Sequence, residues 1–246
     1  MTVERVNAGQ KVFGLTAVQE ALALWGASFL TIILTFILWR SQAKLAATVS
    51  FLYFPYVFMR RRNEDYRDYG VSFRAWKRDL AWALGACALV FPLYFLGFWG
   101  FLHFIPRIPV GLVRVMTPLQ AYSGFHARLP PQFAKWVVDQ LFVVALPEEF
   151  FYRGYLLTRL RDAWPGGRRL FGVRLGPAFF LTAVLFALGH LAIFQAWRLA
   201  VFFPALLFAF LREKTGTVMG CTLVHAACNL FEMFLEVSFT PLWVPR

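Results

Sequence analysis

Residues 136–157 read WVVDQLFVVALPEEFFYRGYLL, a run that is long and apolar enough to cross a lipid bilayer. Its middle nevertheless holds two carboxylates and a guanidinium, those of Glu148, Glu149 and Arg153. Each ionisable side chain inside a spanning helix costs roughly 2.5–3.5 kcal/mol on insertion scales, so such residues suggest a function by default. The stretch therefore predicts a membrane protein with a polar site inside the membrane.

The composition of the whole chain agrees with this interpretation. Of 246 residues, 59% are apolar and only 15% are charged, and the mean hydropathy is +0.58. Such a chain is too apolar for a soluble domain and has room for about seven spans of roughly 20 residues. The aromatic content of 19% excludes intrinsic disorder, and three cysteines exclude a disulfide-rich secreted module. We expect an all-α, polytopic helical bundle that forms one integral membrane domain over residues 1–246.

The apolar runs and the basic stretches between them predict an order of elements. Spans are expected at residues 15–39, 45–59, 81–104, 136–157, 177–194, 198–211 and 217–237. Residues 60–80 and 158–176 are rich in arginine and are expected to be cytoplasmic loops. The proline-rich residues 105–135 are expected to form an interfacial segment that could include a short amphipathic helix.

The distribution of basic residues also predicts an orientation. With residues 60–80 inside, sixteen of the 25 Lys and Arg residues lie on the cytoplasmic side and eight on the other. This bias predicts a multi-pass protein of the plasma (inner) membrane, with the N-terminus in the cytoplasm and the C-terminus outside. It also accounts for most of the net charge of +12, so the expected partner is the bilayer and no nucleic acid is expected.

The charged residues of 136–157 differ in whether a partner of opposite charge lies on the same helix face. Glu149 and Arg153 are spaced i, i+4, share a helix face and can pair, whereas Glu148 lies about 100° around the helix and must find another partner. A structural salt bridge would therefore explain Glu149 with Arg153 but leave Glu148 unexplained. Pro147 cannot donate a backbone hydrogen bond, and we expect it to bend the helix and open a polar notch.

Two later spans carry further polar groups at a similar depth. The stretch FALGH ends in His190, and HAACN places His225 and Asn229 at i, i+4 on one face. A carboxylate and an imidazole can deprotonate a water, while an imidazole and a carboxamide can donate to a developing oxyanion. This set indicates a hydrolase acting on an amide, with Glu148 as the base and Glu149 as an orienting group held by Arg153.

Together, EEFFYR, FALGH and HAACN resemble the EExxxR, FxxxH and HxxxN motifs of the CPBP family, the CAAX proteases and bacteriocin-processing enzymes. The resemblance covers about residues 136–237, with one motif in each of three helices. It implies an intramembrane endopeptidase with a cavity between helices. In such an enzyme Glu148 and His190 would activate a water, and His225 and Asn229 would form the oxyanion hole.

The resemblance leaves the metal question open between two alternatives. A water activated by a carboxylate needs no metal, and HExxH, the usual helical zinc pair, is absent from the sequence, so we expect no cofactor. If the enzyme is instead zinc-dependent, Glu148, His190 and His225 would be the ligands.

The resemblance also spans several substrate classes. They are prenylated CAAX proteins, bacteriocin peptides and, in the myxosortase branch, C-terminal membrane anchors of surface proteins. Twenty arginines against five lysines indicate a GC-rich, bacterial genome and favour a membrane-anchored substrate. Two other classes remain: a non-catalytic scaffold or bacteriocin-immunity protein with this fold, and a proton-coupled transporter. A transporter would be expected to show repeated halves with interrupted helices, which the sequence lacks.

Overall fold

The computed structural model describes residues 9–104 and 122–241, most of which are helical. The longer helices are α1 (Ala17–Leu38), α2 (Ala43–Arg61), α3 (Trp76–Phe104), α8 (Pro177–Gly189), α9 (Phe202–Thr215) and α10 (Met219–Ser238). A composite helix runs through α5 (Phe133–Val138), η4 (Asp139–Ala145), α6 (Leu146–Glu149), η5 (Phe150–Leu156) and α7 (Leu157–Ala163). Short 3₁₀ turns are η1 (Arg40–Gln42), η2 (Tyr66–Tyr69), η6 (His190–Ile193) and η7 (Ala196–Val201).

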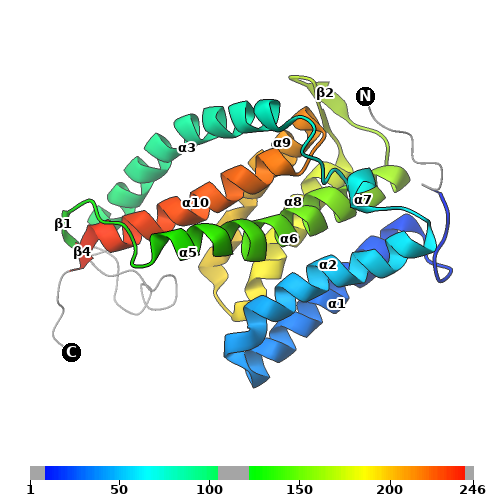
Figure 1. Cartoon of the computed structure of the whole chain (residues 1–246), viewed down its shortest axis with the longest axis horizontal. Coiled ribbons are helices and arrows are strands. Elements are labelled where there is room, and N and C mark those ends of the chain that lie inside the picture. Colours follow the sequence, from blue (N-terminus) through cyan, green and yellow to red (C-terminus); the bar gives the residue numbers. More distant parts are fainter. Residues whose placement is uncertain (1–8, 105–121, 242–246) are drawn as a thin grey trace.

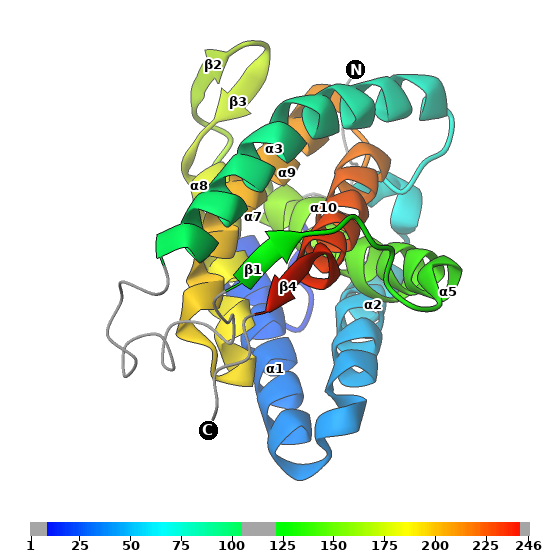
Figure 2. The same cartoon turned by 90° about the vertical axis from the view of Figure 1, so that its left-hand side faces the viewer.

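The composite helix lies in the middle of the bundle. It contacts α10 on one side and the hairpin of α1 and α2 on the other, while α8 and α9 pack against its second half. Helix α3 lies along α10 at the edge of the molecule, as Figures 1 and 2 show. The composite helix, which carries the first motif, therefore contacts both α8 and α10, which carry the other two, and the α1–α2 hairpin supports it from outside.

The predicted apolar runs are helical, but the number of spans stays a prediction. Among the described residues, α1 and α3 are each long and apolar enough to cross a membrane, and Pro177–Ile193 is apolar but shorter. Helix α10 has 20 residues, yet its polar groups, including His225 and Asn229, reduce its hydropathy. The composite helix is divided by changes of helical type, so its pieces are short.

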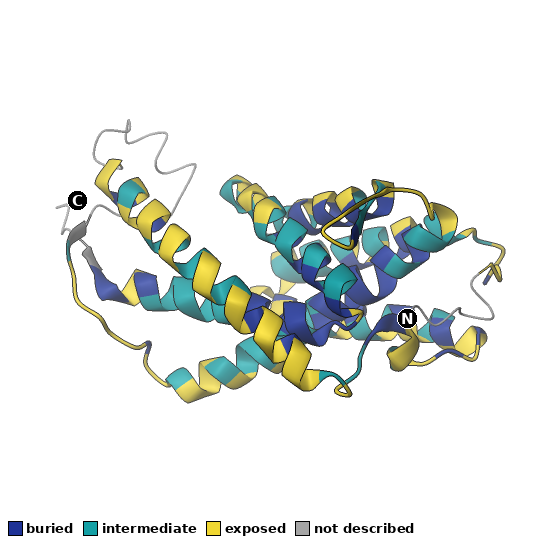
Figure 3. Ribbon diagram, turned by 90° about the horizontal axis from the view of Figure 1, so that it is seen from above, coloured by how far each residue is buried: buried dark blue, intermediate teal, exposed yellow. Residues whose placement is uncertain are grey.

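Helix α3 exposes an apolar face along much of its length, which is coloured as exposed in Figure 3. The large exposed side chains on this helix include Leu84, Leu89, Leu93, Leu96 and Trp99. A continuous apolar surface of this kind is unfavourable in water and is expected where a helix faces lipid. The opposite face packs on α10, where the rings of Phe91 and Phe231 stack at 4.3 Å.

The structure adds two short antiparallel sheets to the predicted all-helical fold. Strand β1 (Tyr122–Phe125) pairs with β4 (Phe239–Pro241), and β2 (Arg168–Leu170) pairs with β3 (Val173–Leu175). The prediction of a basic loop over 158–176 was therefore wrong in detail, because α7 extends to Ala163 and a β-hairpin follows. Most of the predicted interfacial segment, residues 105–121, lies outside the described residues, and the remainder is not helical before Phe133.

The composite helix contains two π-helical stretches, η4 and η5, on either side of α6. At their ends the N–H groups of Leu146 and Leu157 donate five residues back, to the carbonyls of Leu141 and Tyr152. π-Helical turns insert an extra residue per turn and are frequent at functional sites. Here they flank the segment that carries both glutamates.

Pro147 explains part of this irregularity. Because proline has no N–H, it cannot donate to the carbonyl of Val143 four residues earlier. That carbonyl instead accepts a hydrogen bond from Thr48 Oγ1 of α2 at 2.8 Å. The predicted disturbance at Pro147 thus takes the form of a change in helical type, and α2 supplies the missing donor.

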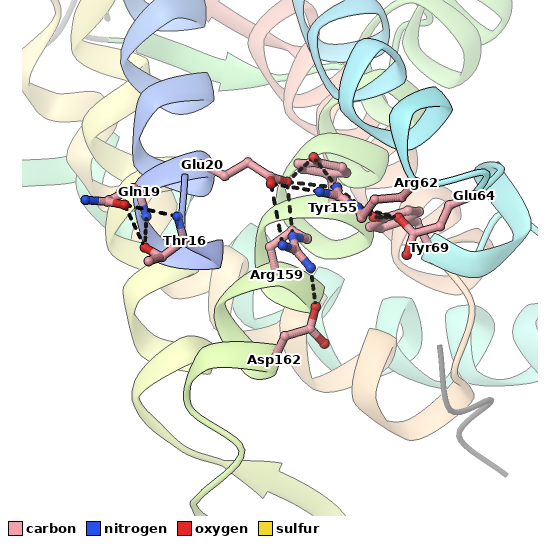
Figure 4. A network of polar contacts seen from close by, with 9 residues as sticks. All are labelled: Thr16, Gln19, Glu20, Arg62, Glu64, Tyr69, Tyr155, Arg159 and Asp162. Carbon is pink, nitrogen blue, oxygen red and sulfur yellow. Dashed lines mark hydrogen bonds and ion pairs between the residues drawn. The ribbon is translucent and has the colours of Figure 1, made fainter. Parts of the chain in front are cut away.

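A buried network, which we name the α1–α7 ion network, fastens the end of the composite helix to the α1–α2 hairpin (Figure 4). Its centre is Glu20 in the first turn of α1, whose side chain is completely buried. Arg62 donates to both oxygens of Glu20 at 2.8 and 2.9 Å, and Arg159 Nε donates to Oε1 at 3.0 Å. The hydroxyl of Tyr155 also donates to Glu20.

The same network extends outward on both sides. Arg62 Nε donates to Glu64 at 2.8 Å, the Tyr69 hydroxyl donates to Glu64 at 2.6 Å, and Arg159 Nη1 donates to Asp162 at 2.8 Å. Within the part of the chain that the structure describes, no buried polar atom of the network lacks a hydrogen-bond partner. Buried charges are tolerated when they are paired in this way, so the network holds α7 firmly on α1.

Candidate active site

Three neighbouring segments bring the six predicted residues into one region. Glu148 and Glu149 lie on α6, and Arg153 lies on η5. His190 is the first residue of η6, directly after α8, while α10 carries the remaining two. The helical spacing predicted from the motifs is present, and the π-helical segments set the direction in which the first three side chains point.

Glu149 is the centre of the charged contacts. Its Oε1 accepts from Arg153 Nη1 at 2.9 Å and lies 2.8 Å from His225 Nδ1. Glu149 and Arg153 are completely buried, and His225 is 5% exposed. The predicted i, i+4 ion pair is thus present, and the structure adds a contact that the spacing did not predict, between Glu149 and the imidazole of α10.

Arg153 is held by more than its ion pair. Its Nη2 donates to the carbonyl of Ala205 at 3.2 Å, and its guanidinium lies 4.2 Å from the ring centre of Phe186 and 5.2 Å from that of Phe208. Cation–π contacts of this kind strengthen when they are shielded from water. Phe186 of the FALGH stretch therefore supports the arginine of the first motif.

Glu148 is less completely paired than Glu149. Its Oε2 lies 3.9 Å from His225 Nε2, which is longer than a direct hydrogen bond and can be bridged by one water. This oxygen is buried and has no hydrogen-bond partner among the described residues, as is also true of Glu149 Oε2 and Arg153 Nε. A buried carboxylate oxygen without a partner is costly and calls for an explanation.

His190 is oriented by its own helix. Its Nδ1 lies 2.9 Å from the carbonyl oxygen of Phe186. Because a carbonyl can only accept, we assign the proton to Nδ1, and in the neutral ring Nε2 then carries the free electron pair. This nitrogen can accept a proton from a water, as the expectation that His190 and Glu148 together activate a water requires.

The two histidines share one aromatic neighbour. The ring of Phe186 lies 4.7 Å from the imidazole of His190 and 5.9 Å from that of His225. The two imidazoles therefore lie around a common phenylalanine and do not point to opposite faces of the bundle.

Asn229 is held one turn further along α10. Its Nδ2 donates to Gln140 Oε1 at 2.8 Å, and Gln140 belongs to the π-helical segment η4. The amide of Asn229 is thereby fixed next to the segment that carries Glu148. The sequence analysis missed Gln140, although a glutamine inside an apolar run was an available signal.

Two further residues shape the site and were also missed. Phe208 of α9 stacks on the imidazole of His225, with ring centres 4.9 Å apart and planes inclined by 15°. Gly189, directly before His190, lies so close to Tyr152 that a Cβ there would be 2.5 Å from the tyrosine hydroxyl oxygen. No local pattern distinguishes Phe208 among 29 phenylalanines, whereas Gly189 lies within the quoted FALGH stretch.

The described part of the site does not have the grouping of ligands that a bound metal ion needs. Within residues 9–104 and 122–241, no group of three His, Cys, Asp or Glu side chains is arranged to hold one. In particular, Glu148, His190 and His225 do not form such a group. The expectation of an enzyme without a cofactor stays a prediction.

Comparison with known families places this site in context. Residues 130–231 match the family model described as type II CAAX prenyl endopeptidase Rce1-like, and all six site residues lie in the matched segment. Comparison with curated proteins and with solved structures finds no match. The order of the motifs, their convergence and this match agree, so residues 130–231 belong to the Rce1-like group of the CAAX protease (CPBP) family.

Proposed function

We propose that this chain is an intramembrane endopeptidase that hydrolyses a peptide bond in membrane-associated or C-terminally anchored proteins, using a water activated by Glu148 and His190. One observation carries the proposal. The buried Glu148 Oε2 has no hydrogen-bond partner among the described residues and lies 3.9 Å from His225 Nε2, a separation that a bridging water can span. Outside this site, the buried carboxylate oxygens without a hydrogen-bond partner among the described residues, Asp79 Oδ1 and Glu213 Oε1, each face an arginine, whereas Glu148 Oε2 faces the imidazole of His225.

The attack on the substrate follows from these positions. The water gives a proton to Glu148 or His190, and its oxygen forms a bond to the carbonyl carbon of the substrate. Negative charge develops on the carbonyl oxygen, which His225 and Asn229 stabilise by donating hydrogen bonds. The C–N bond then breaks, and the proton held by the base passes to the leaving amine, so that atoms and charges balance.

Glu149 and Arg153 act through His225. Nδ1 of His225 donates to the Glu149 carboxylate, which fixes the ring, and Nε2 can donate towards an oxyanion when the ring carries a second proton. Arg153 holds Glu149 in place and offsets its charge. We therefore assign Glu149 and Arg153 as positioning residues and Glu148, His190, His225 and Asn229 as the residues that contact the water or the substrate.

The finer assignments rest on the sequence. The bias of basic residues supports a multi-pass protein of the plasma membrane with its N-terminus in the cytoplasm, and arginine usage supports a substrate anchored in that membrane. The chemistry drawn above needs no metal. Activity that survives exhaustive dialysis against a strong chelator, in a protein that carries no stoichiometric zinc, would support this part of the proposal. Recovery of lost activity by added zinc would contradict it.

The function is tested by comparing cells that contain wild-type protein, Glu148→Gln or no copy of the chain. New protein termini in the membrane fraction, identified by mass spectrometry, should appear with wild type and be absent from the other two. Glu213→Gln is the control, because Glu213 is a buried carboxylate at the far end of α9, paired with Arg161 at 2.6 Å. It should cleave as wild type does.

The same cells distinguish the alternative of a non-catalytic scaffold. If Glu148→Gln restores every phenotype of the deletion strain without restoring any cleavage, the chain works without catalysis and the protease proposal is wrong. Purified wild type and Glu148→Gln, reconstituted in vesicles with an identified substrate, then show whether the cleavage is direct.

A further inference from the structure

The β2–β3 hairpin projects from the bundle after α7 (Figures 1 and 2). Its two-residue turn consists of Phe171 and Gly172, with φ angles of 51° and 79°. A turn with positive φ at both positions favours Asn-Gly or Asp-Gly, and a bulky residue is a genuine outlier there. Phe171 is also 77% exposed. The turn thus carries a residue that is unfavourable both for its backbone and for contact with water.

The residues next to the turn combine exposed apolar and basic side chains. Leu170 is 51% exposed, and Arg168 and Arg169 on β2 are exposed as well. The other strand is anchored, because Val173 is fully buried in a cluster with Phe179. The hairpin therefore has one side fixed to the protein and a free tip of two large apolar residues beside two arginines.

Two contacts place the tip next to the beginning of α3. Lys214 Nζ donates to the Phe171 carbonyl at 2.7 Å, and the same ammonium lies 5.5 Å from the ring centre of Trp82. Trp82 lies near the start of α3, one of the two described helices that can cross a membrane. Tryptophan is enriched at the boundary between lipid and water, so the tip lies where α3 is expected to enter the bilayer.

We propose that the β2–β3 tip is a membrane-contacting site: Leu170 and Phe171 insert into the interface, and Arg168 and Arg169 bind the headgroups of anionic phospholipids. Exposed apolar side chains next to arginines are the combination by which peripheral segments bind anionic lipid surfaces. Contact with lipid would explain why a phenylalanine occupies this turn. Burial of its side chain in the interface is favourable and offsets the strain of its backbone conformation. This proposal is independent of the proteolytic function.

A nitroxide label at Leu170→Cys measures the depth of the tip, in a background with Cys87 and Cys228 replaced by serine. In vesicles of phosphatidylcholine and phosphatidylglycerol, the label should be accessible to oxygen and protected from a water-soluble nickel chelate. A label at Gly166→Cys, in the exposed segment before β2, should be accessible to the chelate. Equal chelate accessibility at both positions, or protection at Leu170 that arises only when another protein is added, would overturn the proposal.

Lipid selectivity is tested by thermal unfolding of the purified protein in detergent. Phosphatidylglycerol should raise the unfolding midpoint more than phosphatidylcholine at equal concentration, because a ligand of the folded state stabilises it. The double variant Arg168→Gln/Arg169→Gln should lose half or more of this shift, whereas Arg60→Gln/Arg67→Gln, with the same change in charge at exposed positions, should keep it. Full retention of the shift by the first variant would contradict the proposal.

Phe171→Asn separates lipid contact from folding. Asparagine suits the turn, so the unfolding midpoint in detergent without lipid should be unchanged or higher than in wild type. The nitroxide at position 170 should nevertheless become accessible to the nickel chelate. A label that stays protected in this variant would show that Phe171 does not anchor the tip.

Discussion

Two buried charge clusters lie on the same composite helix and differ in how completely their atoms are paired. In the α1–α7 ion network, Glu20 accepts from Arg62, Arg159 and Tyr155. In the candidate active site, Glu148 and Glu149 each keep one buried carboxylate oxygen without a hydrogen-bond partner among the described residues. Burying several charges costs desolvation free energy in both clusters. Only in the first cluster is that cost offset by hydrogen bonds and ion pairs to every buried polar atom.

Burial does not distinguish the two clusters, but pairing does, and the other unpartnered carboxylate oxygens, Asp79 Oδ1 and Glu213 Oε1, at least lie in ion pairs with an arginine. A carboxylate surrounded by donors has no electron pair left for a substrate or a water, so the network at Glu20 can only hold helices together. An unpartnered oxygen in a protected site is available to accept a proton. The comparison predicts that mutations in the two clusters have opposite consequences for activity and stability.

The largest effect is expected for Glu148→Gln. Removal of the base should lower cleavage by about 10²–10⁴-fold, while the unfolding midpoint stays constant or rises, because an unpartnered buried oxygen has been replaced by a neutral amide. The measurements are cleavage of an identified substrate in vesicles and thermal unfolding in detergent. A large fall in the midpoint would show that Glu148 is structural, and the comparison of the two clusters would fail.

Glu20→Ala should have the reverse effect. It leaves Arg62 and Arg159 buried without their central carboxylate, and breaking such a cluster costs about 3–5 kcal/mol of unfolding free energy. The fraction that remains folded should cleave at nearly the wild-type rate. Denaturant unfolding and cleavage per folded molecule are the two measurements. Wild-type stability in this variant would contradict the assignment of the network as structural.

Gly189→Ala is expected to have a smaller effect that reaches the active site. The added Cβ would lie 2.5 Å from the Tyr152 hydroxyl, so Tyr152 or the segment with His190 must move. Overpacking of this kind costs about 1–3 kcal/mol, and displacement of His190 should reduce cleavage as well. The double variant Gly189→Ala/Tyr152→Phe removes the clashing hydroxyl and should recover both stability and cleavage. Failure of this rescue would rule out the steric explanation.

The sequence was sufficient to single out the charges of the candidate site, because Glu148, Glu149 and Arg153 lie inside an apolar run, where they are conspicuous. It was not sufficient for the ion network, since Glu20 lies near the start of the predicted span 15–39 and Arg62 lies in the basic stretch 60–80, where charges are ordinary. Their partner Arg159 is 139 residues from Glu20 in the chain. Only the folded structure shows that these side chains meet.

The helices themselves were predicted well and their irregularities were not. Apolar runs gave the positions of α1, α3 and α10, because burial in lipid or protein needs such runs. The π-helical turns depend on tertiary contacts, such as the bond from Thr48 to the Val143 carbonyl, which no local pattern contains. The β2–β3 hairpin was missed because Phe-Gly is an uncommon pair for a turn of this type.

The smallest expected effect tests how the helix near the active site is supported. Thr48→Val keeps the shape of the side chain but removes the donor to the Val143 carbonyl, which should cost about 1 kcal/mol. In Pro147→Ala the restored N–H can itself donate back along the helix, so the same Thr48→Val change should then cost much less. Denaturant unfolding of the four proteins of this double-mutant cycle gives the coupling energy. Equal costs of Thr48→Val in both backgrounds would show that the threonine does not replace the donor that proline lacks, and the irregularity next to Glu148 would need another cause.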